Sequence, residues 1–371
     1  MVARSASPGT VMLLVGTRKG LFRLHAPTKG TGWGIDGPHI AGYEILHTCA
    51  DANDPDTLYA AASHTIWGAH VYRSGDRGAT WSPLATAPHH AQGKFDTPLK
   101  RIWYLAHCRD GRLLAGIDPP GLFQSTDHGL SWQAFNGLNE HPSRETWEPA
   151  RGGFSVHSVY VAADNPGRIY AAVSAGGAYR SNDNGMTWEP ANNGVRAENL
   201  PRRYPQSGHN IHRLVMHPMN TDRLYRQCYN GTYRSDDGGR GWTEISAGLP
   251  SDFGYAICVS RRDADTVFQI PESGSHMRAT VDGKLRIYRS RDGGRLWQAL
   301  DQGLPQSHAY VTVLREALDC DDNDPCGVYF GTSSGHVFVS RDEGDHWQLA
   351  AGYLPRILSI KALDAHAGDA A

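Results

Sequence analysis

One ten-residue pattern recurs six times along the chain and constrains its fold more than any other feature of the sequence. The pattern reads Tyr or Phe, any residue, Ser, any residue, Asp, any residue, Gly, two further residues and Trp. Its copies run 72–81, 123–132, 179–188, 233–242, 288–297 and 338–347, and their tryptophans are 50 to 56 residues apart. A period of this length is typical of propellers and other repeat architectures, so the chain is predicted to form a closed ring of repeats.

A degenerate seventh copy lies first in the chain. There Leu21, Phe22 and Arg23 lead to Trp33 without the Ser and the Asp, 48 residues before Trp81. Upstream of each copy lie two further strand-like runs separated by turn residues, so each repeat is expected to form four antiparallel strands. The sequence thus predicts an all-β fold, a seven-bladed β-propeller with four-stranded antiparallel blades that occupies residues 1–371 as a single domain.

The two ends of the chain predict how the ring closes. The first blade, about 11–37, has no upstream run to act as its inner strand, whereas 356–362 is a strand-like run with no blade of its own. The C-terminal strand is therefore expected to complete the first blade, with six further blades extending to about 355. Such closure leaves no exposed sheet edge.

The repeated motif itself has a structural interpretation. In the copy at 233–242, Asp237 can accept backbone N–H bonds across the turn, and Gly239 can adopt a left-handed conformation. Trp242 can then fill the space between neighbouring sheets with a large apolar ring. Because every repeat needs such a turn, the six aspartates are expected to stabilise hairpins rather than to catalyse a reaction or bind metal.

Composition excludes several classes of partner. The formal net charge is -2, from 36 basic and 38 acidic side chains, which predicts no nucleic-acid partner and no membrane partner. The first apolar run, 11–15, is too short for a signal sequence or a membrane span, so a cytoplasmic protein is expected. Six cysteines without zinc-type spacing are expected to be reduced, although Cys320 and Cys326 are close enough in sequence to pair. The oligomeric state stays open.

With these repeats the chain resembles the BNR or Asp-box repeat propellers. This sialidase-like, WD40/YVTN/BNR-like superfamily includes sialidases, xyloglucan-cleaving enzymes, sortilin-type receptors and a photosystem assembly factor. The runs 14–22, 139–142, 249–254 and 308–316 look like a group of bacterial proteins often labelled glycosyl hydrolase or sialidase-like. The resemblance implies the propeller fold and a glycosidase-like hydrolase. Sialidases carry an Arg-Ile-Pro motif in the first blade, which this chain lacks, so sialidase activity itself is not expected.

The inner strands line the axis of a propeller, so a site is expected at their equivalent positions. Arginines, histidines and tyrosines around one axis suit the binding of an anion and the transfer of a proton. The alternative is that these inner charges pair with one another beneath a plug of loops. Aligning the blades places at such positions Leu46, Arg101, His157, His212, Tyr255, Tyr310 and Arg356.

The long connections 89–100, 139–153 and 196–208 are expected to form a wall around this site. No cofactor is required, but His157 and His212 could hold a divalent metal with Glu44, Glu145 or His308 as a third ligand. The residues predicted to be catalytic are His157, His212, Tyr255, Tyr310 and Glu145. The residues predicted to bind substrate are Arg101, Arg356, Glu44, Trp103, Trp147, Arg203 and His308.

Two functions from different classes remain open. The first is a hydrolase or lyase that acts on a small polar or anionic substrate, which the resemblance suggests to be sugar-derived. In that case the arginines hold negative charge and a histidine acts as base. The second is a non-catalytic scaffold that binds a protein or peptide through one face of the ring, since aromatic and arginine side chains also dominate binding surfaces.

Overall fold

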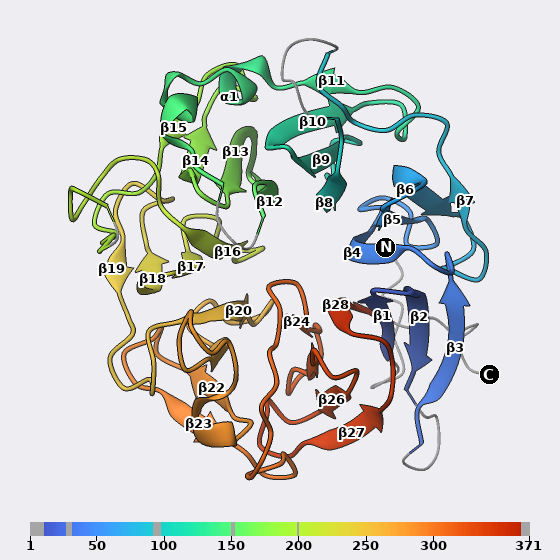
Figure 1. The fold of residues 1–371 in the computed structure, drawn as a ribbon, viewed down its shortest axis with the longest axis vertical. Helices are drawn as coiled ribbons and strands as arrows, with labels where there is room; N and C mark the ends of the chain where they lie inside the picture. Colours follow the sequence, from blue (N-terminus) through green and yellow to red (C-terminus); the bar gives the residue numbers. More distant parts are fainter. Residues whose placement is uncertain (1–10, 27–31, 92–97, 150–152, 199, 365–371) are drawn as a thin grey trace, which may run out of the picture.

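The computed structural model describes residues 11–26, 32–91, 98–149, 153–198 and 200–364. Within them, seven four-stranded antiparallel sheets stand as blades around a central axis, as Figure 1 shows. The prediction of an all-β, seven-bladed propeller is confirmed. We number the blades along the chain, and we call the side of the ring where the inner strands begin the start face and the opposite side the end face.

Each blade runs from an inner strand at the axis to an outer strand at the rim. Blade 1 contains β28 (Ile357–Asp364), β1 (Val11–Thr17), β2 (Gly20–His25) and β3 (Gly34–His39). Blade 2 contains β4 (Glu44–Ala50), β5 (Leu58–His64), β6 (Gly68–Ser74) and β7 (Ser82–Pro83). Blade 3 contains β8 (Arg101–His107), β9 (Leu113–Asp118), β10 (Gly121–Ser125) and β11 (Gln133–Ala134). Blade 4 contains β12 (Val156–Ala162), β13 (Asn165–Val173), β14 (Gly177–Ser181) and β15 (Glu189–Pro190).

The remaining blades repeat this order. Blade 5 contains β16 (Ile211–Met216), β17 (Leu224–Cys228), β18 (Gly231–Ser235) and β19 (Thr243–Glu244). Blade 6 contains β20 (Gly254–Val259), β21 (Val267–Pro271), β22 (Ile287–Ser290) and β23 (Gln298–Leu300). Blade 7 contains β24 (Leu318–Cys320), β25 (Val328–Gly331), β26 (Val337–Ser340) and β27 (Gln348–Ala351). The loops of the described part hold three short helices, α1 (Asn136–Asn139), η1 (Pro142–Thr146) and η2 (Val281–Gly283).

The last strand closes the ring. β28 pairs antiparallel with β1, from Val11 opposite Asp364 to Thr17 opposite Ile357. The predicted closure of blade 1 by the C-terminal strand is therefore confirmed, with the strand at 357–364 rather than 356–362. Arg356 lies just outside it, and its carbonyl accepts a hydrogen bond from the Arg18 amide at 3.0 Å.

The repeated motif folds into the same turn at each of its copies. In the first copy, the Ser74 hydroxyl donates to Asp76 Oδ1 at 2.7 Å and accepts from the Gly78 amide at 2.7 Å. Asp76 Oδ1 also accepts from the Thr80 amide at 2.9 Å. The other five copies repeat all three bonds with the equivalent residues. The aspartate is thus occupied in holding the hairpin, as its position in a turn predicts.

The hydrophobic core lies between neighbouring blades. Tyr59 and Ala61 of β5, for example, pack in one cluster with Ile102 and Leu105 of β8. The six cysteines are buried free thiols, so Cys320 and Cys326 do not form the disulfide that their spacing allowed. No helix among the described residues has the length and apolar character needed to cross a membrane.

Blade 7 departs from the sequence-based alignment. Its inner strand is β24, so the prediction that Tyr310 occupies an inner-strand position is wrong; Tyr310 lies in the preceding loop and is 59% exposed. The run around it alternates like a strand, but its backbone bonds to loops of blades 6 and 7. The Val311 carbonyl accepts from Thr280, and the Ala309 amide donates to Gly283. These backbone hydrogen bonds to loops take the place of the strand pairing that the alternating pattern predicts.

Candidate functional site

A bulge near the start of each of six inner strands defines the start face of the channel. The pairing register shifts in β4, β8, β12, β16, β20 and β28, and the residues skipped are, in that order, Leu46, Trp103, His157, His212, Tyr255 and Leu358. A bulge re-aims the extra side chain. Four of these residues occupy the positions predicted from the sequence. In blade 3, however, Trp103 and not Arg101 holds the equivalent position, because Arg101 precedes the bulge. In blade 1 the prediction of Arg356 is wrong in the same way, since Leu358 holds this position and Arg356 precedes β28.

The two predicted catalytic histidines each bond to the backbone of the next blade. His157 Nε2 lies 3.0 Å from the Ile211 carbonyl oxygen, and His212 Nδ1 lies 2.6 Å from that of Gly254. Burial lowers the pKa of His157 well below its usual value and that of His212 to about 3. Both rings are therefore neutral at pH 7 and link neighbouring inner strands.

Two of the predicted substrate-binding residues pair with each other. Arg101 Nε lies 3.5 Å from Glu44 Oε2, and Arg18 Nε lies 2.9 Å from Glu44 Oε1. For these residues the structure agrees with the alternative that inner charges neutralise one another.

An arginine that the sequence analysis missed has no such partner. The guanidinium carbon of Arg315 lies 5.7 Å from the Trp103 ring centroid and 5.3 Å from that of Tyr255. No hydrogen bond or ion pair reaches its guanidinium within the described part of the chain, and its buried Nε has no acceptor. Burial lowers the pKa of Arg315, whereas Tyr255 and Glu316 raise it and the charge of Arg278 lowers it. Arg315 lies in the run 308–316, whose resemblance to related proteins was visible in the sequence. Because this run was assigned to an inner strand, Tyr310 was predicted as the site residue in place of Arg315.

A buried carboxyl group lies on the same side of the ring. Glu272 follows β21, is fully buried, and neither of its oxygens has a hydrogen-bond partner in the described part of the chain. Burial raises the pKa of Glu272 to about 8, although the charges of Arg278 and Arg356 act in the opposite direction. Its carboxyl group is therefore mostly protonated at pH 7.

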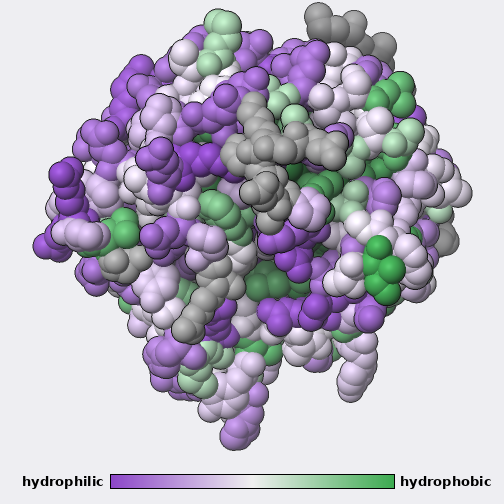
Figure 2. Space-filling view, turned by 45° about the horizontal axis from the view of Figure 1, so that its top comes forward, coloured by the Kyte–Doolittle hydropathy of each residue, from purple (hydrophilic) through white to green (hydrophobic). Residues whose placement is uncertain are grey.

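The predicted loop residues do not converge on one point. The Trp147 ring is buried, and its Nε1 donates to the Tyr179 hydroxyl at 2.7 Å, which makes it a core residue. Glu145 in η1 is exposed, as are His308 and Arg203, whose guanidinium lies over the Tyr204 ring. In Figure 2 the surface is mostly hydrophilic around a recess near the middle of the view, in which hydrophobic residues are visible.

A layer of side chains crosses the channel between the two faces. Arg213 of β16 donates to the Leu318 carbonyl at 3.1 Å, and its Nη2 lies 3.3 Å from Glu316 Oε2. His47 of β4 approaches the same carboxylate oxygen from another side, at 3.7 Å. Because blades 2, 5 and 7 stand on different sides of the ring (Figure 1), these side chains meet near its axis.

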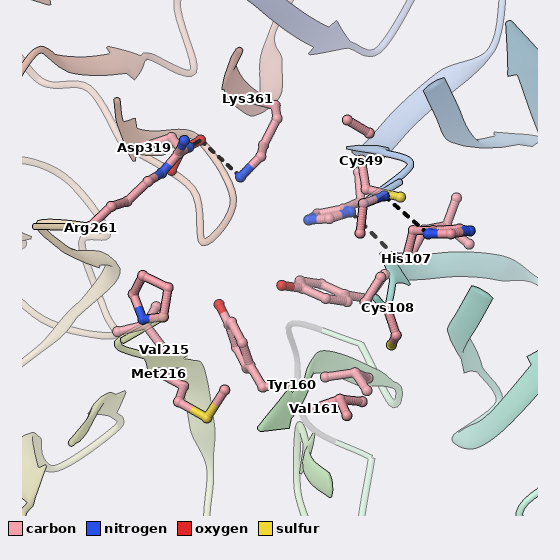
Figure 3. Close-up of a pocket in the computed structure, with 18 of the residues that line it drawn as sticks. Cys49, His107, Cys108, Tyr160, Val161, Val215, Met216, Arg261, Asp319 and Lys361 are labelled. Atoms are coloured by element: carbon pink, nitrogen blue, oxygen red, sulfur yellow. Dashed lines mark hydrogen bonds and ion pairs between the residues drawn. The ribbon is translucent and has the colours of Figure 1, made fainter. Parts of the chain in front are cut away.

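On the end face lies a cavity of about 660 Å³, lined by the later parts of the inner strands. Its polar side holds Asp319, whose Oδ2 lies 3.2 Å from Lys361 Nζ and 3.1 Å from Arg261 Nη2. Figure 3 shows this group on one side of the cavity and Tyr160, Val215 and Met216 on another. The sequence analysis missed this cavity because it aligned only the beginnings of the inner strands.

One group beside this cavity has the composition of a metal site. Ligand atoms of Asp51, His107 and His128 lie within 4.8 Å of one another. However, His107 Nδ1 accepts a hydrogen bond from the Ala52 amide at 3.1 Å, so its proton must lie on Nε2, which is 3.1 Å from Asp51 Oδ2. A metal ligand needs an unprotonated nitrogen. This protonation state leaves His107 no free nitrogen with which to coordinate a metal, so the group is not supported as a metal site.

The structure also fails to support the metal site predicted at His157 and His212. Neither His157 nor His212 belongs to any cluster of three metal-ligating side chains in the described residues. Both rings direct one nitrogen to a backbone carbonyl. The structure therefore gives no support to a shared ion at these histidines.

Comparison with known proteins places the chain among propellers. Residues 122–361 match the family model described as the DUF6242 beta propeller domain. The xyloglucanase Xgh74A of Acetivibrio thermocellus is 29% identical over 271 residues, which are 62% of this chain and 31% of that protein. A xyloglucanase of Paenibacillus sp. is 26% identical over 310 residues, 73% of this chain and 27% of that protein. The chain thus spans about a third of the length of these curated relatives.

Among solved structures, the similarity covers nearly the whole chain, but it concerns the fold alone. YCF48 bound to D1 peptide superposes with a TM-score of 0.55 at 14% identity, covering 93% of this chain and 86% of that one.

Proposed function

The chain belongs to the DUF6242 beta propeller domain family, and from this premise we propose that it is a hydrolase or lyase acting on a small anionic substrate at the start face. The observation that carries the proposal is the unpaired Arg315 guanidinium between Trp103 and Tyr255. Arg315 is partly buried, and its guanidinium has no hydrogen-bond partner in the described residues, so an anionic ligand would reduce the cost of removing it from water.

The surroundings of Arg315 strengthen the case for an anion. The charge of Arg278 lowers the pKa values of Arg315, His212 and Tyr255, so a second cation is close by. Glu272 contributes little negative charge at pH 7, because burial raises its pKa to about 8. A guanidinium presents two parallel N–H donors that match a carboxylate. Arg315 thus replaces Arg101 as the proposed substrate-binding arginine.

One group is suited to proton transfer. A carboxyl group with a pKa of about 8 can donate a proton near neutral pH, which makes Glu272 the proposed acid. His212 Nδ1 must donate to the Gly254 carbonyl, which leaves Nε2 to accept a hydrogen bond from the substrate, but its pKa of about 3 makes it a weak base. His157 is less suited, since its Nε2 bonds to Ile211 and its Nδ1 lies 3.2 Å from the Ser158 hydroxyl. The Tyr255 ring contacts the His212 ring in a tilted arrangement, with ring centroids 4.6 Å apart.

The relatives support the hydrolase over the lyase. Xyloglucanases are the named enzymes among them, and a sugar-derived substrate for this chain is proposed on that ground. Membership of the Asp-box class is proposed as well, supported by the six equivalent Ser–Asp–Gly turns.

A specific observation favours the scaffold as the alternative. Trp67 is 63% exposed beside Tyr43 and His64, with the His64 and Trp67 rings stacked at 4.3 Å. Exposed aromatic groups of this kind suit a protein or peptide partner. The likeness to YCF48 bound to D1 peptide concerns the fold and leaves this alternative open.

The test compares Arg315→Met with a matched control, Arg341→Met, in which an exposed arginine over the Trp33 ring is changed instead. Aryl glycosides and uronate-containing oligosaccharides serve as substrates. We expect turnover by the wild type, a fall in kcat/KM of about 10²-fold for Arg315→Met, and no change for the control. Equal kcat/KM values for both variants and the wild type would overturn the proposal. A wild type that turns over no substrate but binds an acidic peptide through Trp67 would establish the scaffold.

A further inference from the structure

The end-face cavity is separate from the proposed start-face site. It is lined by inner strands of several blades, including β4, β8, β12, β16 and β28, so its walls belong to the rigid part of the ring. A volume of about 660 Å³ lies in the range of small-molecule sites. Arg213 and Glu316 lie at its floor and compensate each other's charge, 3.3 Å apart. The cavity therefore has its own boundaries and its own chemistry.

The charge of this cavity is concentrated on one side. Asp319 Oδ2 receives the Lys361 ammonium at 3.2 Å, the Arg261 guanidinium at 3.1 Å and the Ala362 amide at 3.0 Å. Lys361 and Arg261 lower the pKa of Asp319 to about 2, so one carboxylate faces two cations. Two further carboxylates act on Arg261: that of Asp322, which is half-exposed and 3.9 Å away, and that of Asp364, which is exposed. Water screens both of them, so Asp319 is the buried carboxylate that Lys361 and Arg261 both contact.

Lys361 has hydrogen-bonding capacity to spare. Its ammonium carries three N–H donors, and Asp319 is its one ion-pair partner in the described part of the chain. The side chain is about one-third exposed and comes from the strand that closes the ring, with its ammonium directed toward Asp319 across the polar side of the cavity (Figure 3).

The opposite wall is apolar. Val161, Val215 and Met216 line it in Figure 3, and the Tyr160 ring lies beside them with its hydroxyl group toward the cavity. Such a wall suits a hydrocarbon body rather than a second charged group.

We propose that the end-face cavity binds an organic monocarboxylate, with its carboxylate at Lys361 and Arg261 and its apolar body against Val161, Val215 and Met216. This site is distinct from the start-face site and does not depend on the proposed activity. A carboxylate satisfies the free donors of Lys361 with charge-assisted hydrogen bonds. The walls provide the apolar contact that a small inorganic anion would not use.

The experiment measures the binding of hexanoate and of its neutral counterpart hexanamide to the full chain by calorimetry. We expect saturable binding of hexanoate and binding of hexanamide weakened by about tenfold or more, the loss of one charge-assisted contact. Lys361→Met should lose hexanoate binding, Lys361→Arg should retain it, and Lys19→Met, which removes an exposed lysine on the start face, should not alter it.

A second variant tests the proposal independently in case Lys361→Met does not fold. Met216→Trp fills the apolar side without changing any charge and should also abolish hexanoate binding. Arg315→Met should leave it intact, which separates this site from that on the start face. Equal affinity for hexanoate and hexanamide, unchanged binding by folded Lys361→Met, or the absence of saturable hexanoate binding to the wild type would each overturn the proposal.

Discussion

Arg213 of blade 5 and Glu316 beside blade 7 form an ion pair near the axis of the propeller, with 3.3 Å between Nη2 and Oε2. Both side chains are buried, and Arg213 also donates to the carbonyls of Arg315 and Leu318. Burial raises the pKa of Glu316, while the charge of Arg213 acts to lower it. The pair separates the start face from the end face and connects blades that are not neighbours in the ring.

Arg213→Met should destabilise the ring. It leaves the Glu316 carboxylate buried without its closest cation, a change that costs about 3–5 kcal/mol. Arg213→Met combined with Glu316→Gln should recover part of this loss, because no unpaired charge then remains. Unfolding in urea measures both variants, and a double variant no more stable than Arg213→Met would contradict the pairing.

Removal of the chain after Pro355 should destabilise every blade. The truncation deletes β28, leaves β1 as an unpaired edge and opens the ring. We expect a large fall in Tm in one cooperative transition rather than the fraying of one end. If the truncated chain had the same Tm as the wild type, measured by circular dichroism, closure of the ring would not depend on this strand.

The two turn aspartates Asp237 and Asp183 should differ in their contribution to stability. Asp237 accepts from the Gly241 amide and the Ser235 hydroxyl, whereas Asp183 accepts in addition from the Thr187 hydroxyl at 2.5 Å. Asp237→Ala should therefore cost about 1 kcal/mol, and Asp183→Ala roughly 0.5–1.5 kcal/mol more, the value of one further hydrogen bond. Chemical denaturation checks the order, and a reversed order would contradict this account of the turn. Neither change should alter ligand affinity.

Stability should depend on pH through Glu272. Its pKa rises from 4.5 to about 8 in the folded chain, so between these values the unfolded chain releases a proton that the folded chain retains. The free energy of unfolding should consequently fall as pH rises from about 4.5 to 8. Glu272→Gln removes this penalty and should be more stable than the wild type by roughly 2–5 kcal/mol at pH 8, with little difference at pH 4. The exposed Glu189→Gln serves as control, and identical pH profiles for the two variants would refute the prediction.

His157→Ala should lower the stability of the fold and should not act directly on a catalysed step. The ring is buried and its Nε2 bonds to the Ile211 carbonyl of the next blade, so removal leaves that carbonyl without a donor. We expect a loss of about 1–3 kcal/mol in the free energy of unfolding. If the variant kept its stability but lost turnover, the catalytic role predicted from the sequence would be restored.

Much of the fold could be predicted because its signals are local. Each Ser–Asp–Gly turn forms within four residues, as between Ser74 and Gly78, so the motif dictates the same hairpin wherever it occurs. The orphan strands at the two ends likewise sufficed to predict the pairing of β1 with β28. The equivalent inner-strand positions of His157, His212 and Tyr255 followed from aligning the blades, although the bulges at these positions were not predicted.

The site depended on contacts between residues far apart in the chain. Arg213 and the Leu318 carbonyl are 105 residues apart, and nothing in either local sequence indicates that they meet. Arg101 was expected to hold a substrate and instead faces Glu44, whereas Arg315, in a run taken for a strand, forms no ion pair or side-chain hydrogen bond within the described residues. The sequence by itself determined the repeats, their turns and the closure of the ring, since these follow from local hydrogen bonding and periodic apolar residues. Only the tertiary structure decided which charges neutralise one another and which remain free, because pairing across the axis depends on how seven blades bring distant side chains together.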